Sequence, residues 1–195
     1  MTAEEPLRSR LVAAGAALVA ERGAHGATLR EVARRAGVSH GAPRRYFPTH
    51  LALLSGIARQ GFTQLAGLLA EVVADPAATP HEKILELGRR YVRFAVGNRG
   101  VFELMFRHDL LTSNQFGLRD VSVPLFGTLT ALVAEASPVA HPERTAAALW
   151  PALHGIAQLT AWGSLPLAAG ITDPEPLLRI AVGAFLGPDP APART

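Results

Sequence analysis

The feature that most constrains the fold is residues 28–48, TLREVARRAGVSHGAPRRYFP, where one glycine separates two short helical patterns. Thr28 can cap the first helix, with a glutamate three residues later as in a capping box, and Gly37 ends it. Ser39 is the expected cap of the second helix, which ends before Pro48 because proline disfavours the helical conformation in its predecessor. This stretch therefore predicts two short helices joined by a tight turn.

The remainder of the chain also carries helical periodicity, and no window alternates convincingly with period two. We expect an all-α protein with an N-terminal three-helix bundle and a larger helical domain. The expected helices are one ending at Gly23, then about 50–74, 80–96, 101–107, 115–136, 142–162 and 174–185, with the pair His108 and Asp109 after Arg107 in a solvated loop. The predicted domains are 1–50 and 51–187, followed by a disordered tail at 188–195.

Composition limits the alternatives. The chain of 195 residues has 49% hydrophobic residues and no cysteine, which fits a globular protein in the reducing cytoplasm. No acidic or basic residue occurs between Arg144 and Asp173, a span long enough to cross a bilayer. Its polar residues, glycines and prolines instead favour a helix buried between partners, so no membrane association is expected.

Positive charge is concentrated in one place. The formal net charge is only +3, yet residues 26–50 hold five arginines against one glutamate. Such a patch suits a polyanion, although a solvated basic face is the alternative.

On a helical wheel, Pro43 and Phe47 facing the core would place Arg45 about 160° away and Arg44 about 100° away. A bare Gly41 permits close approach to DNA bases, and arginine forks match guanine or phosphate. With Ser39 as the cap, Pro43 would be the fourth helical residue, and we expect a loose or 3₁₀-like first turn. The pattern predicts a helix-turn-helix whose second helix enters the major groove.

The sequence TLREVARRAGVSHGAPRRYFPTHLALL resembles the DNA-binding domain of TetR-family transcriptional regulators, and the resemblance covers about residues 8–58. It implies that the DNA-binding residues are Thr28, Arg30, Ser39, His40, Gly41, Ala42, Arg44, Arg45, Tyr46 and His50. Two positions depart from the family pattern, which usually has tyrosine at position 44 and lysine at position 50. Arg44 is therefore a weaker candidate base reader than Arg45, and His50 would bind phosphate well only when protonated.

The same resemblance implies a ligand-binding and dimerisation domain that forms a homodimer through the last two long helices. LWPALHG also resembles a TetR subgroup named for Trp150, His154 and Gly155. An apolar site for a small apolar or aromatic effector could be lined by Phe94, Phe102, Met105, Phe106, Phe116, Phe126, Trp150, His154 and Trp162. The alternative is that these side chains are ordinary core, with His154 a satisfied buried histidine.

Enzymatic patterns are not found. The seven histidines show no metal-binding spacing, and there is neither a phosphate-cradling glycine loop nor a nucleophile elbow, so we expect no enzyme, metal or cofactor. The leading hypothesis is a dimeric repressor released from its double-stranded DNA operator by an effector. The alternative is a small-molecule-binding helical protein that does not bind DNA.

Overall fold

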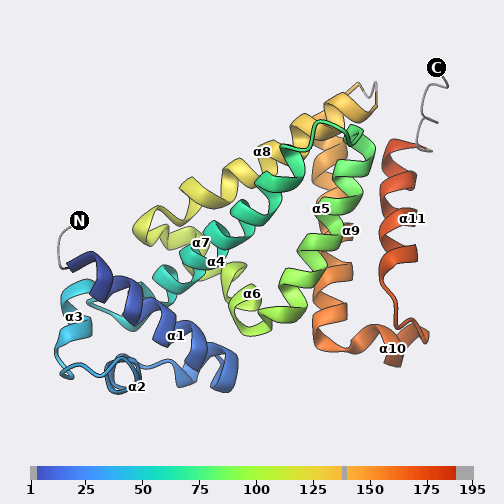
Figure 1. Ribbon diagram of the computed structural model, residues 1–195. Helices are drawn as coiled ribbons and strands as arrows, with labels where there is room; N and C mark the ends of the chain where they lie inside the picture. The colour runs from blue at the N-terminus through green and yellow to red at the C-terminus, as the bar shows by residue number, and fades with distance from the viewer. Residues whose placement is uncertain (1–3, 138–139, 188–195) are drawn as a thin grey trace. The chain divides into compact units, whose positions relative to one another are not determined.

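The computed structural model describes residues 4–137 and 140–187, and every regular element within them is a helix (Figure 1). The expected all-α class is confirmed. The chain divides into two compact units, one formed by residues 1–64 and 98–122 and the other by 65–97 and 123–195. The expected disordered tail at 188–195 lies outside the described residues. The division by function at residue 50 stays a prediction.

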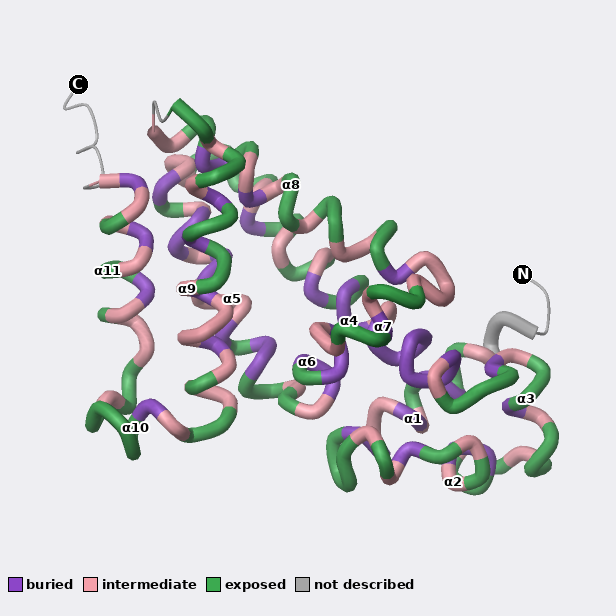
Figure 2. Tube along the Cα trace, turned by 180° about the vertical axis from the view of Figure 1, so that it is seen from behind, coloured by how far each residue is buried: buried purple, intermediate pink, exposed green. Residues whose placement is uncertain are grey.

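The first unit combines the N-terminal helices with a segment from the middle of the chain. Its helices are α1 (Glu4–Gly26), α2 (Leu29–Arg35), α3 (Ala42–Tyr46), the first part of α4 (His50–Val73), α6 (Arg99–Met105), α7 (His108–Ser113), a 3₁₀ turn η1 (Gln115–Gly117) and the start of α8 (Leu118–Ala136). A Cβ built at Gly100 of α6 would lie 2.8 Å from the Val19 carbonyl oxygen of α1. Helices α1 and α6 therefore pack almost backbone to backbone. In Figure 2, buried residues recur along α1, α4 and α6.

The second unit is a layered bundle. It contains the end of α4, α5 (Pro80–Gly97), most of α8, α9 (Pro142–Trp162), α10 (Ser164–Ala169) and α11 (Glu175–Leu186), with α5 packed on both α9 and α11. Gly88 of α5 makes this possible, because a Cβ there would lie 3.3 Å from Leu178 of α11 and 3.5 Å from Leu153 of α9. Ile84, Val92, Ala146, Leu149, Leu153, Ala157, Leu178 and Val182 fill the core between them.

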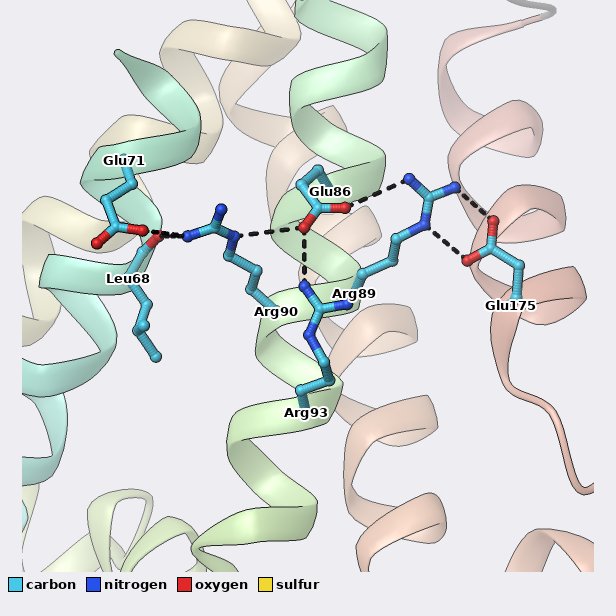
Figure 3. Close-up of polar contacts among 7 residues, drawn as sticks. All are labelled: Leu68, Glu71, Glu86, Arg89, Arg90, Arg93 and Glu175. Atoms are coloured by element: carbon cyan, nitrogen blue, oxygen red, sulfur yellow. Dashed lines mark hydrogen bonds and ion pairs between the residues drawn. The ribbon is translucent and has the colours of Figure 1, made fainter. Parts of the chain in front are cut away.

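An ion-pair network ties three helices of the second unit together (Figure 3). Glu86 on α5 accepts hydrogen bonds from Arg89, Arg90 and Arg93, at 3.4, 3.3 and 2.8 Å. Arg90 also reaches Glu71 of α4 at 2.6 Å, and Arg89 forms a two-bonded pair with Glu175 of α11 at 2.8 and 2.5 Å. Burial raises the pKa of Glu86, but the three guanidinium groups outweigh it and leave that pKa below the ordinary value.

The structure corrects several expected boundaries. Helix α1 continues past a kink at Gly23 to Gly26, and the expected loop after Arg107 contains helix α7. The uncharged stretch after Arg144 is divided by Gly163, whose φ is 71°, into α9 and the unforeseen α10. Pro151 lies inside α9. Among the described residues, one helix, 115–136, is long and apolar enough to cross a membrane, which is weak evidence because soluble core helices pass the same test.

Candidate nucleic-acid interface

The anchor of α3 is a buried aromatic ring. Pro43 is buried and Phe47 has no exposed surface, as the helical wheel requires. The Phe47 ring lies against Gly56 of α4, where a Cβ would be only 2.7 Å from a ring carbon. Its other neighbour is Phe116, with ring centroids 5.6 Å apart and an interplanar angle of 74°. A helix of five residues has little stability of its own, so these contacts fix its orientation.

The opposite side of α3 is open to solvent. Arg44 and Arg45 are exposed, and so are Ser39, His40 and Gly41 in the preceding turn. Ala42 and Tyr46 are half-buried on the flanks. The structure thus presents both arginines outward from a helix whose inner side is held by Phe47.

The beginning of α3 differs from the prediction. Its cap is Gly41 rather than Ser39, so Pro43 falls in the first turn, where its missing N–H removes no internal hydrogen bond. The expected 3₁₀ character is present, because Ala42 N donates to the Ser39 carbonyl at 3.0 Å and Arg44 N to the Gly41 carbonyl at 3.2 Å. Serine is intrinsically the better cap because its side chain can accept a backbone hydrogen bond, which glycine cannot do.

The start of α2 agrees with the prediction. Thr28 is the cap, and its hydroxyl oxygen accepts a hydrogen bond from Glu31 N at 3.2 Å. The hydroxyl proton remains available for a phosphate oxygen. Arg30, in the first turn of α2, and His50, at the start of α4, are exposed as well.

Acidic neighbours divide the five clustered arginines into two groups. Arg34 pairs with Glu31 at 3.0 Å, and Arg35 pairs with Glu21, whose pKa its guanidinium holds below the ordinary value. Among the described residues, the other three arginines, Arg30, Arg44 and Arg45, have no ion-pair partner. The cations that remain for a polyanion are those of α3 and the first turn of α2.

Two family matches cover the two parts of the chain. Residues 11–57 match bacterial regulatory proteins of the tetR family, and residues 84–185 match the tetracyclin repressor-like C-terminal domain. The chain belongs to the TetR family. It is a DNA-binding transcriptional regulator with a helix-turn-helix at its N-terminus, in a family whose members bind DNA operators and are typically not enzymes. The Trp-His-Gly subgroup is not confirmed by these matches.

Solved structures with a similar fold cover almost the whole chain. A protein of unknown function from Rhodococcus sp. RHA1 superposes with a TM-score of 0.79 and 28% identity, over 92% of this chain and 93% of that one. A transcriptional regulator from the same organism gives 0.71 and 27%, over 95% and 99%. The multidrug binding protein EbrR, complexed with imidazole, gives 0.63 and 27%, over 96% and 98%. No curated protein sequence matches significantly.

The residues predicted to contact an effector are not all in one unit. Phe102, Met105, Phe106 and Phe116 belong to the first unit, whereas Phe94, Phe126, Trp150, His154 and Trp162 belong to the second. In the second unit, Trp150 lies between Phe126 and His154, with ring centroids 6.5 and 5.8 Å away.

Tyr91 of α5 joins this cluster and was missed by sequence reasoning. Its hydroxyl lies 2.7 Å from Nδ1 of His154. Burial raises the pKa of Tyr91, partly opposed by a hydrogen bond with Trp150, and burial lowers the pKa of His154. Since an indole N–H can only donate, Tyr91 accepts the hydrogen bond from Trp150, and the direction of its bond with His154 is set by the tautomer of that histidine. The sequence signal that could have identified Tyr91 is a single tyrosine within the apolar face of a helix.

Proposed function

We propose that this TetR-family protein is a dimeric, sequence-specific repressor that leaves its operator when a small apolar or aromatic effector binds the second unit. The observation that carries the DNA-binding part is the exposure of Arg44 and Arg45, which have no acidic partner in the part of the chain that the structure describes, on a helix anchored from behind by Phe47. Arg45 is assigned to a base edge and Arg44 to a base edge or phosphate. Thr28, Arg30, Tyr46 and His50 are assigned to phosphates, with His40, Gly41, Ala42 and Ser39 close to the groove.

The effector site is assigned to the second unit around His154. Tyr91, Trp150 and His154 combine aromatic surface with partly buried hydrogen-bonding groups, which is the composition of small-molecule sites. EbrR, a structural relative, is a multidrug binding protein. The finer assignment to the Trp-His-Gly subgroup is supported only by Trp150, His154 and Gly155 themselves. The cytoplasm is the expected compartment.

The dimer is assigned to α9 and α11, the last two long helices. Both carry exposed apolar side chains: Leu159 and Trp162 on α9 are 39% and 48% exposed, and Ile180 on α11 is 67% exposed. A charge introduced by Ile180→Glu should shift the protein toward monomer in a sedimentation measurement. Val123→Glu on α8, where the native side chain is 62% exposed, is the matched control and should leave the mass unchanged.

Salt dependence tests DNA binding directly. A duplex selected from random sequence by the protein should lose about a thousandfold or more in affinity between 50 and 200 mM salt, if six or more phosphates are neutralised. Fluorescence anisotropy at several salt concentrations gives the slope. Two-fold symmetry predicts half-sites about 34 to 36 Å apart, or a multiple of that. A helical protein that does not bind DNA would select no duplex.

A further inference from the structure

A strained segment precedes α8 in the first unit. Residues 114–117, which we call the strap, have positive φ at Asn114 (48°), Phe116 (58°) and Gly117 (63°). Glycine adopts this conformation freely and asparagine tolerates it, but a bulky phenylalanine is an outlier that the surroundings must hold in place. Such strain persists only where neighbouring contacts over-determine it, and it concentrates at functional sites.

Three sets of contacts hold the strap in place. One guanidinium nitrogen of Arg59, on α4, donates to the Phe116 carbonyl at 2.8 Å and to the Gly117 carbonyl at 2.7 Å. The Asn114 side-chain oxygen accepts a hydrogen bond from the backbone N–H of Arg119 at 2.8 Å. Fully buried leucines, Leu110 and Leu118, fix the chain on either side.

The strap touches the DNA-reading helix through a ring. Phe116 meets Phe47 edge to face, and the Arg8 guanidinium of α1 covers both rings at 4.9 Å from Phe116 and 5.9 Å from Phe47. Edge-to-face pairs and cation–π contacts have preferred geometries, so the contacts among Arg8, Phe47 and Phe116 resist both tilting and displacement of the Phe47 ring. All three residues lie within the first unit.

We infer that the strap sets the orientation of α3 on DNA, with Phe116 and Arg59 as positioning residues that contact no nucleotide themselves. The inference rests on the proposed DNA-binding function and adds the contacts that hold α3 in place. Phe116 lies two residues before Leu118, where α8 begins, so the strap ties the start of α8 to Phe47.

The test compares Phe116→Leu with Phe106→Leu. Leucine keeps apolar bulk, so both variants should fold, but it offers no ring to Phe47 or Arg8. Phe106 is the matched control because it is a half-buried phenylalanine of the same unit that makes edge contacts to Phe62 and Phe102 instead. Folded fraction and thermal midpoint are measured for both, together with affinity for the selected duplex and for random DNA.

We expect Phe116→Leu to lose about tenfold in affinity for the selected duplex, comparable to one lost base contact, and less than twofold for random DNA. Phe116→Tyr should restore most of the loss. Phe106→Leu should keep its DNA affinity even where its thermal midpoint falls. Equal losses in the two leucine variants, or none in Phe116→Leu, overturn the inference. Wild-type protein that selects no duplex overturns the proposed function instead.

Discussion

Arginines serve opposite purposes in the two units. In the second unit, Arg89, Arg90 and Arg93 converge on Glu86, and two of them reach further acids on α4 and α11 (Figure 3). In the first unit, Arg44 and Arg45 point outward without an acidic partner among the described residues. Paired guanidinium groups join helices and largely cancel their own field, whereas unpaired ones attract a polyanion.

This comparison shows that a local excess of arginine is not by itself a binding site. The sequence has five arginines in residues 26–50, but the acids that pair with Arg34 and Arg35 include Glu21, which lies outside that window. Structure reduces the available cations to Arg30, Arg44 and Arg45. Their distribution over α2 and α3 is what a groove-bound helix-turn-helix needs.

The largest expected effect comes from removing an unpaired arginine. Arg45→Ala should cost roughly 1 to 3 kcal/mol of affinity for the selected duplex and relax preference at one base pair, because a two-bonded contact to guanine is lost. Anisotropy against a panel of single-base variants measures both effects. Arg93→Ala, a paired arginine of the second unit, is the control and should leave DNA affinity unchanged. Unaltered base preference in Arg45→Ala would refute its base-reading role.

Two equivalent helix caps give the next comparison. Thr28 caps α2 and Thr79 caps α5, each accepting a hydrogen bond at 3.2 Å from the residue three positions later. Replacing either by alanine should lower the free energy of unfolding by about 1 kcal/mol. Only Thr28→Ala should also weaken DNA binding, by about fivefold and nearly equally for all sequences, because one phosphate hydrogen bond is lost. A similar loss of DNA affinity in Thr79→Ala would show a general stability effect.

The smallest effect is expected from replacing Glu86, the glutamate that pairs with three arginines of α5. Glu86→Gln leaves three guanidinium groups without their shared carboxylate and should lower the free energy of unfolding by about 1 kcal/mol or less, since the pairs are partly exposed. Denaturant unfolding measures the change, and the salt slope of DNA binding should stay as in the wild type. A changed slope would mean that these arginines also meet DNA.

Lowering the pH should reproduce this loss of unfolding free energy. The pKa values of Glu86 and Glu175 are held below the ordinary 4.5, so their contribution to stability is present above pH 4.5 and disappears as the pH falls through the lowered values. The midpoint of denaturant unfolding of the wild-type protein should therefore fall as the pH is lowered below 4.5. Glu86→Gln should show a shallower drop over the same range, and an identical drop would assign the acid sensitivity to other carboxylates.

The sequence predicted well whatever depends on local spacing. The long helix 142–162, the Thr28 cap and the inward Phe47 all follow from periodicity and side-chain chemistry within a few residues. The expected helix 115–136 is correct from Leu118 onward, whereas residues 115–117 form a 3₁₀ turn. The beginning of α3 differs from the expectation because serine is the better intrinsic cap, whereas the placement of α3 also depends on Phe47, whose ring packs against Gly56 of α4.

Features that depend on distant contacts were not predictable. Tyr91 meets His154 from 63 positions away, and Arg59 reaches Phe116 from 57. No local pattern encodes either pairing. For the same reason the sequence gives no sign that the candidate effector residues fall into two groups, although the chain returns to the first unit between residues 98 and 122 and carries three phenylalanines and Met105 of that set there.

The return of the chain to the first unit limits how the DNA-binding helices can be isolated as a fragment. A fragment ending at residue 50 would keep every side chain assigned to the groove and yet lose both surfaces on which Phe47 rests, Gly56 and Phe116. It would also uncover Val19, whose backbone lies under α6. A chimaera that places these DNA-binding helices on another protein must therefore also include a second, non-contiguous segment of the chain.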